Sequence, residues 1–341
     1  MQKTVFYNLV IFTVVLFSGC DWLGHSEPEP ASPVQPKVVQ SLQLEQLTKN
    51  IAADPQNPQL LYQRGLLHFK VGNITDAEVD FQKAIKLKPD PEYYFALSNL
   101  HYTNQDITRA MNVLKEGITI NPHSVELFLP LVRFHIYLEQ YDQAIKYADE
   151  ALIIDANNAE AYLLKGVIFE SIGDTSRAIS SYTTAIEQDP KLYDGYMKLG
   201  IIYSPSNANL AIQYFDNALK VKPEDAEAQY GIAKTYQDRG ETANAIKAYR
   251  DLAITNPDFE KAFYNLGYIY FQQDSIDKAE KNFNIAVSVA PQYADAYYMI
   301  GLCAEVNDDN AKAINYYDQT LKIKGNHELA IKGLNRLRKQ N

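Results

Sequence analysis

The 341-residue sequence contains only two cysteines, Cys20 and Cys303, so disulfide bonds cannot be the framework of its fold. Glycine and proline number 15 each, too few for a collagen-like or low-complexity chain. Basic residues are outnumbered by acidic ones, 32 to 42, whereas general nucleic-acid binders present a basic surface to phosphate. Aromatic residues are plentiful instead, with 25 Tyr and 14 Phe, so the chain can bury a core and is not disordered throughout.

A hydrophobic run long enough to remain in a membrane is also missing at the N-terminus. The apolar stretch covers only residues 5–17 and is interrupted by Asn8 and Thr13. As a helix it would span about 20 Å, whereas a bilayer core needs about 20 residues to cross ~30 Å. We therefore interpret residues 1–19 as an export signal, with Lys3 as its weak positive region.

The end of this signal carries a second motif. Residues 16–20, Leu-Phe-Ser-Gly-Cys, resemble the lipobox of bacterial lipoproteins, although Phe17 stands where an aliphatic residue is usual. The resemblance implies that a peptidase cuts before Cys20 and that Cys20 carries the lipid anchor. A signal cut elsewhere, with Cys20 incidental, is the alternative. The expected location is the bacterial cell envelope, with the choice between inner and outer membrane left open.

Residues 20–40 carry four prolines and no helical periodicity, which predicts an extended linker between the anchor and the folded body. The prolines are Pro28, Pro30, Pro33 and Pro36.

One internal period organises the rest of the chain, because alanines recur at a nearly constant interval. The alanines are Ala77, Ala110, Ala144, Ala178, Ala211, Ala245, Ala279 and Ala313. Most of these alanines follow a small residue at a fixed distance along the chain. These small residues are Gly65, Ser98, Gly166, Ala233, Gly267 and Gly301. In the remaining two repeats, Gly200 is one place closer to its alanine, and Val132 stands where the other repeats have a small residue. Large side chains recur one helical turn before each small residue and one turn after each alanine, with few exceptions.

Offsets of three and four places put side chains on one face of a helix, so each unit is expected to contain two amphipathic helices. A turn is expected near its middle at Gly72, Gly173, Gly240 or a polar equivalent such as Asp274. We expect the small residue and the alanine to face each other where the helices come closest. Six units end in a proline, which cannot continue a helix. Such short pairs cannot bury both faces alone, so neighbouring units must stack.

This pattern resembles the tetratricopeptide repeat (TPR). The resemblance covers residues 58–327 as about eight repeats and implies an all-α fold, a right-handed α-solenoid. The fifth repeat is one residue shorter, around residues 204–207. Residues 41–57 are predicted to form a leading half-repeat helix, over Leu42–Ala53, and residues 328–341 a closing capping helix.

The resemblance also implies that the first helices line a concave groove that binds peptide or protein segments. The fifth residue of each repeat is expected to face this groove, and all eight are apolar or aromatic. With Tyr268 and Phe271, which extend an aromatic cluster in the seventh repeat, the predicted groove residues are Tyr62, Phe95, Leu129, Leu163, Met197, Tyr230, Tyr264, Tyr268, Phe271 and Tyr298. Packing within the scaffold is the alternative explanation for the same residues.

The second residue of a repeat is acidic in six of the eight: Glu92, Glu126, Glu160, Asp194, Glu227 and Asp295. Carboxylates near a helix N-terminus are favoured by the helix dipole, which is a sufficient reason for the pattern. They also make the groove favour a basic partner segment over an acidic one.

Three histidines, His68, His101 and His135, occupy one equivalent place in consecutive repeats. Equivalent places lie about 10 Å apart, whereas zinc needs each ligand nitrogen at about 2.0–2.1 Å, so no shared metal is expected. Cys303 is predicted to be a buried small residue.

We expect no enzyme activity and no cofactor, because no nucleophile elbow, zinc-protease motif or phosphate-binding glycine loop is present. The predicted function is a lipid-anchored scaffold that binds a protein segment, with no nucleic-acid partner. Its oligomeric state is open. The alternatives are an accessory component of an enzyme or carbohydrate-processing system, and a self-associating array.

Overall fold

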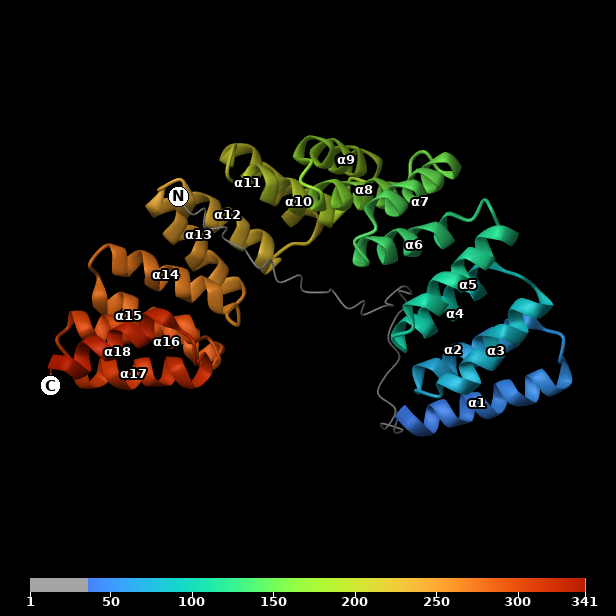
Figure 1. Ribbon diagram of the computed structural model, residues 1–341, viewed down its shortest axis with the longest axis horizontal. Helices are drawn as coiled ribbons and strands as arrows, with labels where there is room; N and C mark the ends of the chain where they lie inside the picture. The colour runs from blue at the N-terminus through green and yellow to red at the C-terminus, as the bar shows by residue number, and fades with distance from the viewer. Residues whose placement is uncertain (1–35, 341) are drawn as a thin grey trace, which may run out of the picture.

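The computed structural model describes residues 36–340, which form eighteen helices and no strand in that range (Figure 1). The first helices of the eight repeats are α2 (Pro58–Lys70), α4 (Pro91–Thr103), α6 (Val125–Tyr137), α8 (Ala159–Ser171), α10 (Tyr193–Tyr203), α12 (Ala226–Asp238), α14 (Glu260–Gln272) and α16 (Ala294–Val306). The second helices are α3 (Ile74–Leu87), α5 (Ile107–Ile120), α7 (Tyr141–Ile154), α9 (Thr175–Gln188), α11 (Ala208–Val221), α13 (Thr242–Thr255), α15 (Ile276–Val289) and α17 (Asn310–Ile323). The predicted all-α repeat architecture is confirmed.

Two further helices flank the repeats: α1 (Pro36–Ala53) and α18 (Glu328–Gln340). Helix α1 begins earlier than the predicted leading helix, so residues 36–40 are helical and do not belong to an extended linker. Proline is tolerated at a first helical position because its missing N–H has no helical acceptor there. The predicted signal peptide, Cys20 and the rest of the linker lie outside the described residues.

The turns inside the hairpins share one backbone feature. Seven of them contain a residue with positive φ at equivalent places: Gly72, Gln105, Glu139, Gly173, Gly240, Asp274 and Asp308. The predicted glycines therefore stand where a left-handed backbone conformation is needed. The fifth repeat lacks this residue, because α10 ends at Tyr203 and a shorter turn leads to Ala208.

All eight second helices end two places before the position of the closing proline. This holds for the six repeats that have the proline and for the third and eighth, which carry Ala156 and Gly325 there. Proline is therefore not required to end these helices at this place.

The close approach between paired helices involves an aromatic ring more than the recurring alanine. A Cβ atom added at Gly166 would lie 2.4 Å from the Tyr182 ring, and one at Gly65 would lie 2.7 Å from the Phe81 ring. The predicted contact with the alanine occurs at Ser98, whose hydroxyl donates to the carbonyl of Ala110 at 3.0 Å. The expectation is thus corrected: at the glycine positions, the missing side chain mainly makes room for the ring one turn after the alanine.

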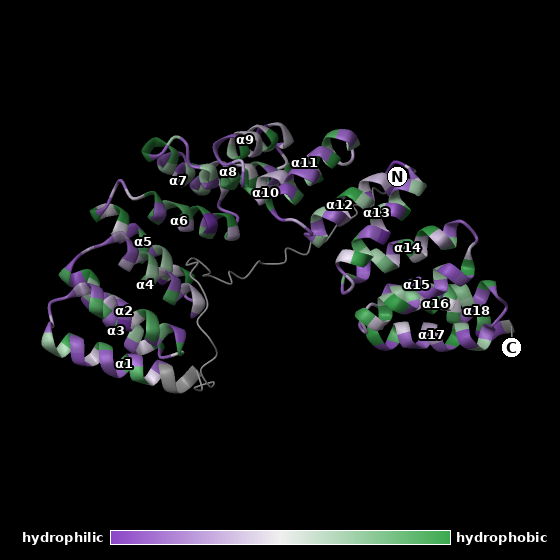
Figure 2. Cartoon of the chain, turned by 180° about the vertical axis from the view of Figure 1, so that it is seen from behind, coloured by the Kyte–Doolittle hydropathy of each residue, from purple (hydrophilic) through white to green (hydrophobic). Residues whose placement is uncertain are grey.

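Stacked repeats produce a curved array with α1 at one end and α18 at the other (Figure 1). First helices contact the first helices of neighbouring repeats, as in α2 with α4 and α4 with α6. They lie on the inner side of the curve, as the figure shows for α6 relative to α7. Apolar and polar residues alternate around the helices, and the core clusters follow one another along the array (Figure 2).

No helix within residues 36–340 combines the length and apolar character needed to cross a bilayer.

The glycine contacts lead to a stability prediction. Replacing Gly166 by Val should destabilise the array by ~1–3 kcal/mol, because the new side chain must displace the Tyr182 ring from a packed core. Urea unfolding followed by circular dichroism measures this change. The control is Gly325→Val, where an added Cβ meets only the Leu321 carbonyl oxygen at 3.7 Å. Equal stability of the two variants would contradict the packing described here.

Candidate partner-binding surface

Several predicted groove residues prove to be part of the core. Tyr62, Leu129 and Leu163 are buried, with 7%, 8% and 9% of their surface exposed. The Tyr62 hydroxyl donates to Glu92 at 3.0 Å, and burial raises its pKa. These side chains pack between adjacent repeats and have little exposed surface, so their burial favours the scaffold-packing explanation over a role in a groove.

The predicted aromatic cluster of the seventh repeat is also largely structural. Tyr264 packs against Phe283 and Tyr293, with ring centroids 5.6 and 5.0 Å away, and burial raises its pKa to about 12. Tyr268 and Phe271 are half-buried and pack against the same core cluster. The remaining predicted residues are half-buried: Met197, Tyr230 and Tyr298.

Exposed apolar side chains occur on the first helices of several repeats, including Ile201 on α10 and Val306 on α16, and four of them lie on the first helices of the first three repeats. They are Leu66 on α2, Phe95 and Tyr102 on α4, and Tyr137 on α6, with 39%, 44%, 40% and 65% of their surface exposed. We call these four residues the inner patch. Of them, only Phe95 was predicted from the sequence. Leu66 and Tyr102 occupy the ninth and twelfth places of their repeats, which share a helical face with the fifth place, and Tyr137 occupies the thirteenth, to one side of that face.

Helix α4 shows why the patch is exposed. Phe95, Asn99 and Tyr102 follow one another at helical spacing and form one exposed stripe. The opposite side of the helix is buried between neighbouring repeats. The Tyr102 ring also packs against Phe134 of the next repeat, with centroids 5.2 Å apart, so its position is fixed by the scaffold.

Hydrogen-bond acceptors lie in the first turns of α4 and α6, two of the helices that carry the inner patch. Pro130 lies inside α6 and has no N–H, so the carbonyl of Glu126 lacks its usual helical donor. The carboxylate of Glu126 is itself exposed. Within residues 36–340, Glu92 and Glu126 form no ion pair. Both can therefore accept hydrogen bonds from a basic segment.

Three of the four acidic residues at the second place of later repeats are engaged within the array, whereas Asp194 is exposed and forms no ion pair within residues 36–340. Glu160 pairs with Arg133 at 2.6 Å, and Glu227 pairs with Lys261 at 3.2 Å. Asp295 lies 3.0 Å from His327. Pairing between repeats thus adds to the helix-dipole explanation, and among these six residues Glu92, Glu126 and Asp194 form no ion pair within residues 36–340.

The three equivalent histidines have separate surroundings. His68 Nδ1 lies 3.3 Å from the Asn73 amide nitrogen, and His101 Nε2 lies 3.9 Å from Glu78. His135 stacks on Tyr147, and burial lowers its pKa. The part of the chain that the structure describes contains no group of three or more His, Cys, Asp or Glu side chains that could hold a metal ion.

Cys303 is buried in the core, as predicted, and burial raises the pKa of its thiol to about 12. It therefore has the environment of a small apolar residue and not that of a reactive thiolate.

A curved stack of two-helix repeats with a continuous core and an accessible inner surface defines the class of α-solenoids. Models of the tetratricopeptide repeat family match residues 58–91, 101–168 and 159–192, and overlapping matches extend over residues 206–258, 230–281 and 264–328. The chain belongs to the tetratricopeptide repeat family, whose members bind peptides or proteins.

Relatives extend over much of the array. The chain is 26% identical to human tetratricopeptide repeat protein 6 over 62% of this chain and 41% of the relative. It is 27% identical to the human mitochondrial import receptor subunit TOM70, over 55% of this chain and 35% of that protein. The chain thus spans about half or less of the length of these curated relatives.

Among solved structures, the C-terminal part of a TPR repeat-containing protein from Cytophaga hutchinsonii has a similar fold. Its TM-score is 0.57 with 21% sequence identity, over 70% of this chain and 99% of that one.

Because the predicted groove residues differ in burial, replacing them by Ala should change the free energy of unfolding by different amounts. Tyr264→Ala should destabilise the chain by about 2–4 kcal/mol, because it leaves a cavity beside Phe283 and Tyr293. Phe95→Ala should change stability by no more than about 0.5 kcal/mol, because its ring is exposed. Thermal and urea unfolding provide both values. A large loss in Phe95→Ala would show that the inner patch is part of the core.

Proposed function

We propose that this chain is a lipid-anchored scaffold of the bacterial cell envelope that helps to assemble a protein complex there. It binds a segment of a partner protein on the inner surface of its first three repeats and has no catalytic role of its own. The observation that carries this proposal is the exposure of Leu66, Phe95, Tyr102 and Tyr137 on three adjacent first helices. Apolar side chains gathered on one face mark an interaction site more often than scattered ones do.

The chemistry of the surface specifies the partner segment. The exposed rings favour aliphatic or aromatic side chains, because contact removes apolar surface from water. Glu92 and Glu126 favour a basic residue close to them. We therefore propose a segment that combines apolar anchors with Lys or Arg.

Replacing Phe95 and Tyr102 together by Ala tests this site. Capture of a partner from solubilised membranes should weaken about tenfold or more, because two aromatic contacts are lost at the centre of the site. The control is the double variant Ile153→Ala, Ile254→Ala, which removes side chains that are 83% and 77% exposed on second helices. The proposal fails if the two double variants capture the same proteins in equal amounts while both remain folded.

The anchor rests on the lipobox-like residues 16–20 and is tested separately. Cys20→Ser should move the protein from the membrane fraction to the soluble fraction, because attached acyl chains contribute ~0.8 kcal/mol per buried CH₂. Cys303→Ser is the matched control, since Cys303 is buried in the core. If Cys20→Ser remains in the membrane after a high-salt wash, Cys20 is not the anchor.

A further inference from the structure

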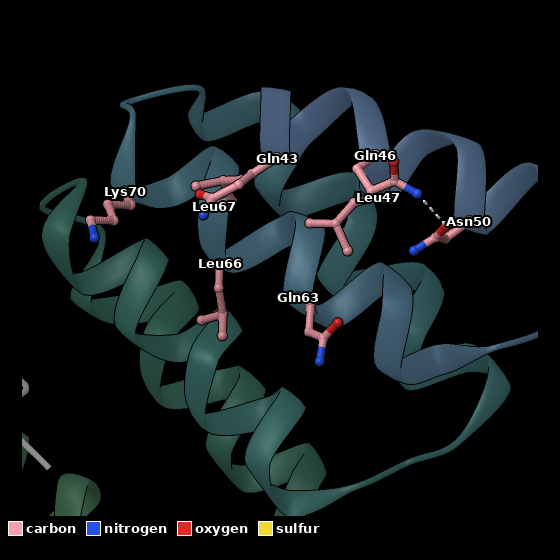
Figure 3. A pocket seen from close by; sticks show the side chains of 8 residues that line it. All are labelled: Gln43, Gln46, Leu47, Asn50, Gln63, Leu66, Leu67 and Lys70. Atoms are coloured by element: carbon pink, nitrogen blue, oxygen red, sulfur yellow. Dashed lines mark hydrogen bonds between the residues drawn. The ribbon is translucent and has the colours of Figure 1, made fainter. Parts of the chain in front are cut away.

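A cleft lies between α1 and α2, at the N-terminal end of the described array (Figure 3). It has a volume of about 460 Å³. Four carboxamide side chains, three leucines and one lysine line it: Gln43, Gln46, Leu47, Asn50, Gln63, Leu66, Leu67 and Lys70. Leu66 also belongs to the inner patch, so an occupant of the cleft covers Leu66 and leaves Phe95, Tyr102 and Tyr137 to a partner segment.

The repeat period explains why the cleft exists. Gln43, Leu47 and Asn50 of α1 each stand one full period before Ala77, Phe81 and Ala84 of α3. In the first repeat, Ala77, Phe81 and Ala84 are fully buried, and the Phe81 ring packs against Gly65 of the first helix. Helix α1 is therefore the second helix of a repeat whose first helix is absent from the described residues, and the cleft is the place of that first helix.

The other end has the complementary arrangement. Ile331, Asn335 and Arg338 of α18 each stand one full period after Tyr297, Gly301 and Ala304 of α16. In α16 this stripe contacts the paired second helix, as the Tyr317 ring does at Gly301. In α18 the three side chains are exposed, and no second helix follows α18 within residues 36–340. Arg338 pairs with Asp318 of α17 at 3.0 Å, so Ile331 and Asn335 are the members of this stripe available to a new neighbour.

Helix α18 is nevertheless firmly held by its own repeat. Ala330, Leu334 and Leu337 are buried against the preceding repeat, and Arg336 binds both carboxylate oxygens of Glu305 at 2.6 and 2.8 Å. His327 accepts a hydrogen bond from the Ala330 N–H at 3.2 Å, which caps the start of the helix. Helix α18 therefore presents its exposed stripe as a rigid surface.

We infer that copies of this chain associate head to tail, with α18 of one copy occupying the cleft between α1 and α2 of the next. The two half-repeats then complete one full repeat. An interface between two different surfaces of identical chains leaves both ends available, so it generates an open row.

The side chains in the cleft are suited to this occupant. Within a repeat, the fourth residue faces the twenty-seventh, as Tyr94 faces Gly117, so Ile331 would lie against Asn50 and near Leu47. The eighth residue faces the twenty-fourth, as Gly166 faces Tyr182, so Asn335 would lie against Leu47. Its carboxamide would be near Gln43, since the eighth residue also approaches the twentieth, as Ser98 does Ala110. Lys70 lies at the end of the cleft where the C-terminus of the docked α18 would lie. Its positive charge would interact favourably with the free carbonyl groups at that helix end. Most side chains of the cleft are polar, and the exposed stripe of α18 is partly polar. Both surfaces can therefore be exposed to water in a chain that is not associated with another copy.

Sedimentation of the full chain over a range of concentrations tests the inference. The weight-average mass of the wild type should rise with concentration beyond that of one chain. Leu47→Arg and Ile331→Arg should each weaken this association about tenfold or more, because each buries an unpaired charge at the joint. The controls are Leu42→Arg and Leu329→Arg, on the same two helices, whose side chains are 59% and 53% exposed and do not line the cleft.

A cysteine cross-link gives a second readout that does not depend on the stability of the variants. In a Cys20→Ser background, chains with Asn50→Cys are mixed with chains with Ile331→Cys under mild oxidation, while Cys303 remains buried. The predicted result is a disulfide-linked dimer from this mixture and little from Asn50→Cys with Leu329→Cys. A chain that stays monomeric at all concentrations, or equal cross-linking in both mixtures, overturns the inference.

Discussion

The contact between an aromatic ring of the second helix and a small residue of the first is the constraint on which this array depends. At Gly166, Gly200, Gly267 and Gly301 an added Cβ would lie 2.4 to 2.7 Å from a ring atom of the paired helix. The ring fills the space between the helices and also touches the next repeat, as Phe215 does at Gly231. A pair of helices cannot bury such a ring alone, so each repeat needs its neighbour. Repetition of this contact gives the chain its continuous core and its curvature.

The same constraint determines which side chains remain available for binding. Residues at the fifth place of a repeat stand close to the junction with the next repeat, and Tyr62 and Tyr264 pack into that junction. Phe95 is the exception, since it remains 44% exposed. The accessible inner surface is supplied mainly by residues one or two turns further along the first helix. Tyr102 contacts Phe134 of the next repeat on one side and still keeps 40% of its surface exposed.

Sequence periodicity predicted the fold well because the fold repeats a local rule. The spacing of the alanines located the eight hairpins, and the glycines at 72, 173 and 240 marked turns with positive φ. The binding surface was harder to predict, because a tyrosine at the fifth place has the same sequence signature whether its ring faces solvent or a neighbouring repeat. The spacing does not specify which side chains of a first helix the neighbouring repeats cover, so the exposure of Tyr102 and Tyr137 could not be predicted from it. The early start of α1 was missed because Pro36 was interpreted as part of a linker and not as a first helical residue.

The central claim is that partners bind the inner surface of the first three repeats and not the outer surface. A photo-crosslinking amino acid placed at Phe95 or Tyr102, in cells that express the full chain, tests this most directly. Ile254, which is 77% exposed on α13, is the matched outer position. The account predicts a discrete cross-linked partner from both inner positions and none from Ile254. Cross-linking of the same partner from Ile254, with none from Phe95 and Tyr102, would contradict it.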